Sequence, residues 1–124
     1  MSRVAVPGFG LALVLFAATA LAHHSFVGNY DSAKLVTLKG TVTKVRYGNP
    51  HIFFSVDVPG KGIWRVEAES ISKTKAKGLT KEHLKRGTPV TVTGWPSKNG
   101  RAALGLQSII VPGGKTIKIR GTAR

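Results

Sequence analysis

The chain has 124 residues, which is enough for a single small domain. It contains no cysteine, so disulfide bonds and thiolate metal sites are excluded. The 19 Lys and Arg residues outnumber the 5 Asp and Glu residues and give a net charge of +14. Such a charge predicts attraction to anions, either nucleic acid, acidic lipid or acidic glycan. A basic surface that is merely solvated is the alternative.

Residues 1–22 have the pattern of a signal peptide. After a basic residue near the N-terminus, Leu11–Ala18 forms an apolar stretch and Ala20-Leu21-Ala22 is an A-x-A cleavage site. An uncleaved anchor is the alternative, because Val4–Ala22 approaches the ~20 residues that span a bilayer. A proline, two glycines and the small residues at the cleavage site argue against it. We therefore expect an exported protein, periplasmic or secreted, that begins at His23 and has no transmembrane span after cleavage.

The segment that follows the cleavage site, residues 23–34, lacks any hydrophobic periodicity. It is expected to form an extended N-terminal arm. Phe26 and Tyr30 are the two side chains that could anchor this arm by packing against the domain. The domain itself is expected to occupy residues 35–120.

The first strand of the domain is expected at Val36–Tyr47, and it ends at the turn residues 48–50. Its apolar alternation slips between Val42 and Val45. Because the side-chain period of a strand is two, such a slip predicts either a bulge or a change of the buried face. Gly40, close to the slip, would allow this strand to curl sharply.

Alternating apolar residues predict two further strands, Ile52–Val58 and Ile63–Glu69, joined by a glycine-rich hairpin turn. Trp64 has the phase of a core residue in the second of these strands. Glu67 and Glu69 have the opposite phase, and we expect them to form salt bridges with basic side chains rather than to act as catalytic acids.

The stretch Ser70–Gly87 is rich in lysine and interrupts the strand pattern. Thr80 is a suitable N-cap for a short helix over Lys81–Lys85 that stops at the glycine. Trp95 closes the strand that comes next and is expected to be partly exposed. The last three predicted strands are Val90–Gly94, Ala102–Val111 with a bulge near Gly105, and Thr116–Ile119.

The order of these elements predicts the fold. Three strands, a short helical crossing and two more strands are the sequence of elements in an oligonucleotide/oligosaccharide-binding (OB) barrel. We therefore predict an all-β domain, a small five-stranded OB-like, partly open barrel with one short helix. A small β-sandwich with the same number of strands is the alternative.

The placement of the histidines is the most informative chemical feature. His23 and His24 would open the mature chain, and His51 starts the second strand. An N-terminal histidine offers its α-amino nitrogen and a ring nitrogen, and a further imidazole could complete a nitrogen-rich site of the kind that Cu(II) prefers. Both kinds of group lose their protons near neutral pH. An arm of about ten residues, at ~3.3 Å each, can reach the second strand. We predict metal binding by these three histidines, with copper ahead of zinc.

The alternative for the same histidines is purely structural, with solvated terminal residues and a turn capped by His51. The sequence contains no nucleophile elbow, no pair of carboxylates with an evident acid–base arrangement and no phosphate-binding glycine loop. We therefore expect a binding protein rather than an enzyme. Redox chemistry at a bound copper ion is the one enzymatic hypothesis that remains open.

A second functional hypothesis rests on the basic stretch between the third and fourth strands. Its lysines would form a polyanion-binding or envelope-binding surface. Exported proteins seldom meet nucleic acid, so we expect the anion to be acidic lipid or glycan. The lysines in question are Lys73, Lys75, Lys77, Lys81 and Lys85.

A series of short motifs runs along the mature chain: His23-His24-Ser25-Phe26, Tyr30-Asp31, Gly40-Thr41-Val42, Asn49-Pro50-His51, Trp64-x-x-Glu67, Leu84-Lys85-x-Gly87 and Val90-x-Val92-x-Gly94. Together with the signal peptide they resemble a family of small exported bacterial proteins that has no assigned function. The resemblance covers essentially the whole mature chain and implies an exported, barrel-like single domain, without supplying an activity or a ligand. The chain departs from the family pattern in its very basic Lys73–Lys85 segment and in Thr88, where an acidic residue is common.

Overall fold

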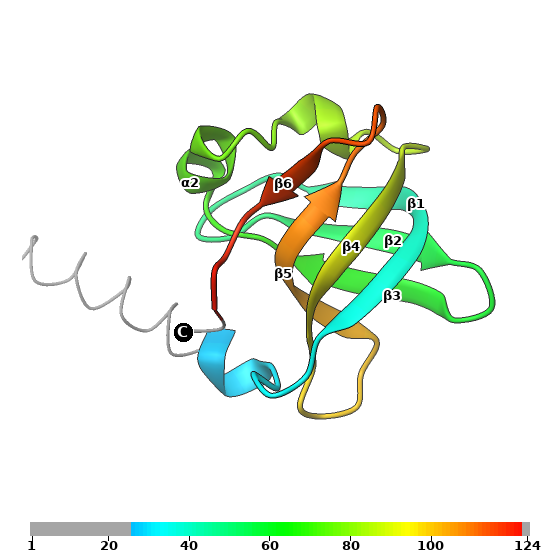
Figure 1. The fold of residues 1–124 in the computed structure, drawn as a ribbon, viewed down its shortest axis with the longest axis vertical. Coiled ribbons are helices and arrows are strands. Elements are labelled where there is room, and N and C mark those ends of the chain that lie inside the picture. Colours follow the sequence, from blue (N-terminus) through cyan, green and yellow to red (C-terminus); the bar gives the residue numbers. More distant parts are fainter. Residues whose placement is uncertain (1–25, 123–124) are drawn as a thin grey trace, which may run out of the picture.

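The computed structural model describes residues 26–122. After a helical turn at residues 26–29, the chain forms six strands, one short α-helix and one 3₁₀-helix, η1 (Figure 1). The elements are β1 Val36–Arg46, β2 Phe53–Val58, β3 Gly62–Glu67, α2 Ile71–Ala76, η1 Lys81–Leu84, β4 Pro89–Pro96, β5 Ala103–Ile110 and β6 Thr116–Lys118.

The six strands form one sheet in the order β3-β2-β1-β4-β5-β6, and a parallel pairing of β3 with β5 closes it into a barrel. All other pairings are antiparallel. The barrel consists of β1 to β5, and the short β6 continues the sheet beyond β5 (Figure 1). This arrangement, with a helical connection between β3 and β4, confirms the predicted OB-like five-stranded barrel.

Strand β1 is long because it serves two neighbours, pairing with β4 in its first half and with β2 in its second. The register with β2 shifts between Val42 and Lys44, which leaves Thr43 as a bulged residue. The slip predicted from the sequence is therefore confirmed. At Gly40 a Cβ atom would collide with the backbone carbonyl of Asp57, so the strands can cross this closely only at a glycine.

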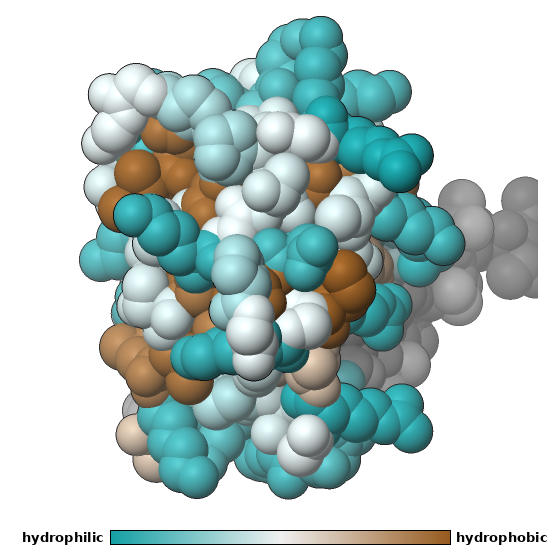
Figure 2. All heavy atoms as spheres, turned by 90° about the vertical axis from the view of Figure 1, so that its right-hand side faces the viewer, coloured by the Kyte–Doolittle hydropathy of each residue, from teal (hydrophilic) through white to brown (hydrophobic). Residues whose placement is uncertain are grey.

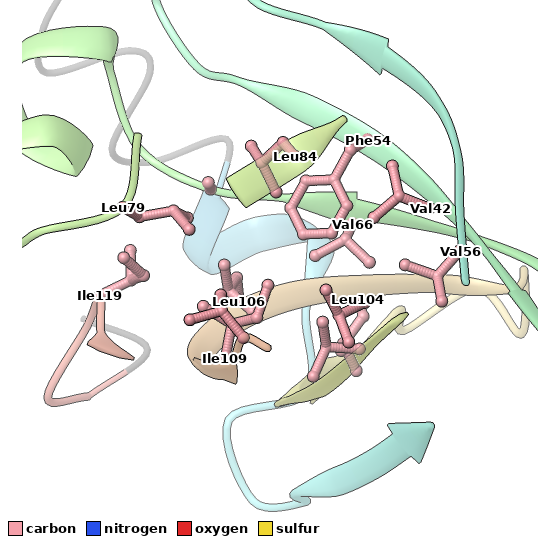
Figure 3. Close-up of a cluster of buried hydrophobic side chains, with 14 of the residues drawn as sticks. Val42, Phe54, Val56, Val66, Leu79, Leu84, Leu104, Leu106, Ile109 and Ile119 are labelled. Atoms are coloured by element: carbon pink, nitrogen blue, oxygen red, sulfur yellow. The ribbon is translucent and has the colours of Figure 1, made fainter. Parts of the chain in front are cut away.

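The inner faces of the strands fill the barrel with aliphatic side chains and one aromatic ring, that of Phe54 (Figure 3). Val42 and Val66 lie around this ring. The connection between β3 and β4 adds Leu79 and Leu84, which are fully buried. The helical crossing therefore does more than join two strands, because its apolar side chains complete the core.

The connection between β3 and β4 contains two helical segments, whereas the sequence predicted one. Helix α2 was missed; Ser70 Oγ caps it by accepting a hydrogen bond from the backbone N–H of Lys73 at 3.3 Å. Asn49 Oδ1 accepts a second bond, from the N–H of Ile71, at 3.0 Å. That partner lies on a distant turn, so no local pattern indicates it. The helix predicted at Lys81–Lys85 is present as η1.

The bulge predicted near Gly105 in β5 is present. The register between β4 and β5 shifts between Thr93 and Gly94, which leaves Gln107, two positions after Gly105, as the extra residue of β5. Gly105 is required for a different reason, since a Cβ atom at this position would lie 2.6 Å from the ring of Phe26. The glycine therefore marks a close contact of β5 with the N-terminal segment.

The surface of the domain carries both hydrophilic and hydrophobic side chains. On the face from which the β2–β3 hairpin projects, hydrophilic side chains separate several small hydrophobic patches (Figure 2). The large exposed hydrophobic residues of the described range are Leu35, Ile63 and Ile110, which come from different parts of the chain. Between residues 26 and 122 no helix has the length and apolar character needed to cross a membrane.

Candidate functional site

A second hydrophobic cluster lies on the outside of the barrel and consists of Phe26, Tyr30 and Trp95. The ring centroids of Phe26 and Tyr30 are 4.7 Å apart, and Phe26 meets Trp95 edge-on at 6.2 Å. Residues 26–29 are helical, so this part of the predicted extended arm is a helical turn. Both predicted anchors, Phe26 in this turn and Tyr30 directly after it, are buried because they pack against Trp95 and each other.

Backbone contacts attach this segment to the end of β4. Tyr30 forms an isolated antiparallel bridge with Ser97. The N–H of Asp31 donates to the carbonyl of Pro96 at 2.8 Å, and the carbonyl of Asn29 accepts a bond at 2.9 Å from the turn after β4. The chain therefore enters the domain at a fixed point on the outer surface of the barrel.

The environments of the two tryptophans are the reverse of those predicted. Trp95 is only 4% exposed, because the N-terminal segment covers the outer face of β4. Trp64, which was predicted for the core, is half-buried and packs against the edge of the main cluster. The alternation of side chains along a strand predicts which residues lie on each face of the sheet. It does not predict that a distant segment will cover the outer face, as the N-terminal segment does at Trp95.

The carboxylate of Glu67 lies beneath the same segment. It is 7% exposed, although the alternation of β3 assigns it to the polar face. The hydroxyl of Tyr30 donates to Glu67 Oε1 at 3.2 Å, and His51 Nδ1 lies 3.1 Å from Oε2. Burial, followed by the charge of Glu67, raises the pKa of Tyr30 well above its usual value, so the phenol is a hydrogen-bond donor at neutral pH.

His51 is positioned by the backbone ladder between β2 and β3. The ladder continues past the strand ends, since Ile52 donates to the carbonyl of Glu69 at 2.9 Å and accepts from the N–H of Ala68 at 2.8 Å. The His51 side chain is 17% exposed. Within residues 26–122 its Nε2 atom has no recorded hydrogen bond, and it is not among the buried polar atoms that lack a partner. Within this range the nitrogen is therefore not engaged by another protein group.

A second carboxylate, Glu69, is held by two cations. Arg120 Nη1 lies 2.9 Å from Oε1, and Lys77 Nζ lies 2.8 Å from Oε2. Burial opposes ionisation of Glu69, but the hydrogen bond from Lys77 and the charges of Arg120 and Lys77 outweigh it and lower the pKa of this carboxyl group. The salt bridges predicted for Glu69 are thus present, whereas the partner of Glu67 is the imidazole of His51, which lies within hydrogen-bond distance.

Only one of the three predicted metal ligands, His51, falls in the part of the chain that the structure describes. His23 and His24 lie outside it. Among the described residues no three His, Cys, Asp or Glu side chains gather in a metal-binding group. Glu67, the partner of His51, and Tyr30, which donates to Glu67, were not predicted to belong to the site. The alignment of the two neighbouring strands could have indicated Glu67. It pairs with Phe53, two positions after His51, so Glu67 and His51 lie on the same face of the sheet.

The predicted lysine surface divides into paired and unpaired side chains. Lys77 is committed to Glu69 and also donates to the carbonyl of Ile119. Lys85 lies 2.6 Å from Glu82 in an exposed pair. The five lysines are therefore not equivalent as free cations, and Lys77 belongs to the structural framework.

Solved structures with a similar fold include two of TiaS and one of a complex named Stn1–Ten1. The complex of TiaS with a tRNA and ATP matches with a TM-score of 0.50 and 23% identity, over 66% of this chain and 19% of that chain. Apo TiaS, a tRNA agmatidine synthetase, matches with a TM-score of 0.50 and 22% identity, over 65% and 18%. The S. pombe Stn1–Ten1 complex matches with a TM-score of 0.50 and 18% identity, over 60% and 55%. The chain spans less than a fifth of the length of the TiaS chains, and at these identities the likeness concerns the fold alone.

No curated protein matches the sequence. A family model does match, over residues 12–107, and this range includes β1 to β4, His51, Glu67 and most of β5. The match agrees with the resemblance to a family without an assigned function. Since it covers most of the 124 residues, the chain belongs to DUF6152, a family of unknown function.

Proposed function

We propose that this protein is an exported, non-enzymatic metal-binding protein in which His51 and the two histidines that would open the mature chain, His23 and His24, hold a Cu(II) ion. One observation carries the proposal: His51 Nδ1 lies 3.1 Å from a buried carboxylate, that of Glu67, while the imidazole is partly exposed and no hydrogen bond to its Nε2 is recorded within residues 26–122. A signal peptide at residues 1–22 would direct the protein to the periplasm or the medium.

The pairing of His51 with Glu67 has the form that metal-binding histidines use. A ligating imidazole usually donates its other N–H to a carboxylate, which fixes the tautomer and raises the basicity of the ligating nitrogen. In the proposed site Nδ1 would donate to the Glu67 carboxylate and Nε2 would bind the metal. Tyr30 holds the second oxygen of Glu67, so the carboxylate is itself oriented.

The anchoring of Phe26 supports a site that includes the preceding residues. Phe26 packs on Tyr30, and the Tyr30 hydroxyl reaches the same carboxylate that orients His51. A chain of two or three residues spans at most about 10 Å. Ligands immediately before Phe26 would therefore be attached close to His51. Metal binding would then cost less conformational entropy than if a free arm of about ten residues had to be ordered.

The chemistry of the proposed donor set favours copper. A cleaved chain that begins at His23 would offer an α-amine and imidazole nitrogens, and Cu(II) binds such ligands more tightly than the other divalent first-row metals. The amine has to be unblocked, so export and cleavage would be prerequisites for binding.

Copper titration of the exported protein tests this proposal. We expect one Cu(II) per chain with nitrogen-rich coordination in the paramagnetic resonance spectrum. His51→Ala and a methionine placed before His23 should each weaken binding, and Glu67→Gln should weaken it by about 10- to 100-fold. His83→Ala is the matched control, because the His83 ring accepts a hydrogen bond from the backbone N–H of Thr80, the residue before η1. Equal affinity in all of these forms, or an exported chain whose mass shows a different first residue, would contradict the proposal.

A second candidate function, attraction to acidic lipid or glycan, is favoured by the distribution of charge. Within residues 26–122 the structure records ion pairs to acidic side chains for only three lysines, Lys34, Lys77 and Lys85, and for one arginine, Arg120. The remaining cations of this range have no such partner and would lend the surface a strongly positive field. Binding to heparin that weakens steeply with added salt would support this candidate.

A further inference from the structure

A groove of about 540 Å³ lies between the second half of β1 and η1. Its edges carry four cationic side chains, Lys44, Lys81, Lys85 and Arg86, and its apolar part includes Tyr47 and Leu84. Neither the proposed metal site nor the predicted lysine surface includes this combination of cations and apolar side chains. The bulge at Thr43 contributes to the groove, since Thr43 also lines it and begins the part of β1 that borders η1.

The electrostatic balance of the groove is strongly positive. Lys85 is the one of the four cations with a recorded acidic partner in the described chain, and that partner, Glu82, is itself exposed. Exposed pairs of this kind are weak and exchange readily with solvent or a ligand. An anionic ligand in the groove would therefore meet several cations without having to displace a buried ion pair.

The aromatic ring in the groove adds a second element of recognition. Tyr47 is half-buried, and Lys81 Nζ lies 5.6 Å from its ring centroid. A ring face beside a cation suits a ligand in which a flat, apolar C–H surface adjoins a negative charge. A pyranose ring that carries a carboxylate has this form.

The groove fits a saccharide better than a membrane. A protein that docks on a bilayer usually presents apolar side chains that enter the interface next to the cations. The large exposed hydrophobic residues of the described range, Leu35, Ile63 and Ile110, do not line this groove. The apolar residues that do line it are buried or half-buried, so they do not project from the surface as a membrane-inserting side chain would.

We propose that this groove binds an acidic oligosaccharide, with carboxylates on Lys44, Lys81 and Arg86 and a sugar ring against Tyr47. The proposal deepens the second candidate function by naming a site and a ligand class, and it is independent of the metal site. It also differs from the predicted lysine surface, because Lys73, Lys75 and Lys77 do not line the groove.

Calorimetric titration of the exported protein with an oligogalacturonate tests the proposal. The double variant Lys81→Gln/Arg86→Gln should lower the affinity at least about tenfold, because hydrogen bonds to charged groups are lost. Tyr47→Leu should also lower it, without any change of charge. The matched control is Lys61→Gln/Lys98→Gln, which removes the same charge from exposed turns that do not line the groove and should have little effect. A neutral oligosaccharide of the same length should not bind.

The outcomes distinguish the groove proposal from the second candidate function, which needs only a positive surface. If both double variants weaken binding equally, attraction depends on the overall charge, and the groove proposal is overturned while the second candidate function stands. If the oligogalacturonate, heparin and vesicles of phosphatidylglycerol all fail to bind at low salt, both proposals fail. If vesicles of phosphatidylglycerol bind through the groove residues and the oligogalacturonate does not, the ligand is a lipid and the saccharide proposal is overturned. Copper affinity should be the same in the Lys81→Gln/Arg86→Gln variant and in the wild type.

Discussion

The guanidinium carbon of Arg120 lies 3.7 Å from the centroid of the Phe26 ring, so a residue close to one end of the described chain covers a residue at the other. In Figure 1 the chain after β6 runs down to the helical turn at residues 26–29. Arg120 also donates to Glu69 Oε1 at 2.9 Å and to the carbonyl of Ala68 at 3.0 Å. One largely buried side chain thus connects the N-terminal segment, the C-terminal segment and the end of β3.

Substitution of Arg120 should therefore destabilise the folded protein. Arg120→Gln removes one cation from Glu69, the bond to Ala68 and the contact with Phe26, and we expect the free energy of unfolding to fall by about 3 kcal/mol. Arg120→Lys keeps the charge but loses the planar fork, so it should be intermediate. Urea denaturation measures both. Arg101→Gln, in an exposed turn, is the control and should change stability by less than about 0.5 kcal/mol. An equally small effect of Arg120→Gln would contradict this role.

Gly105→Ala should loosen the N-terminal segment in particular. The added Cβ would lie 2.6 Å from the Phe26 ring and 3.0 Å from the Tyr30 ring, so these rings must move. We expect a loss of about 1–3 kcal/mol together with weaker copper binding, measured by denaturation and by titration. Gly28→Ala makes the same chemical change in the same segment, where nothing lies within 4 Å, and should be neutral or slightly stabilising. Similar behaviour of the two variants would show that crowding of the anchor is unimportant.

The barrel could be predicted because the sequence pattern of each strand is visible within that strand. Each strand carries its own alternation, and the slip in β1 and the short helical crossing identify the OB-like order before any contact is known. Helix α2 was missed because one of its stabilising bonds comes from Asn49, 22 positions before the residue it contacts.

The candidate site was only partly predictable, because it depends on what covers the barrel. Glu67 has the phase of an exposed residue, yet the N-terminal segment buries it. Tyr30, the residue of that segment that bonds to Glu67, lies 37 positions earlier in the chain. The burial of Trp95 has the same origin. His51 could be identified from its residue type, whereas the carboxylate that orients it depends on a cross-strand neighbour.

The stability of the protein should fall in acid partly because of Glu69. Its pKa in the folded state lies below the usual 4.5, so its contribution is fully present above that value and is lost as the pH falls through the folded-state pKa. In Glu69→Gln this contribution is absent at every pH. We expect the difference in unfolding free energy between wild type and variant to shrink below pH 4.5. Urea denaturation across that range measures it, and a constant difference would contradict the assignment.

Tyr30 should act at the opposite end of the pH scale. Burial and the charge of Glu67 raise its pKa in the folded state above the usual 10.0, so the neutral phenol is favoured by folding. Its contribution is therefore complete below pH 10.0 and is lost as the pH rises beyond it. Tyr30→Phe removes the bond to Glu67 and should cost about 1–3 kcal/mol at neutral pH. This cost should decrease in alkaline solution, where the wild type loses the same contribution. Denaturation of both proteins at neutral and alkaline pH measures the difference, which would stay constant if Tyr30 served only to fill space between Phe26 and the barrel.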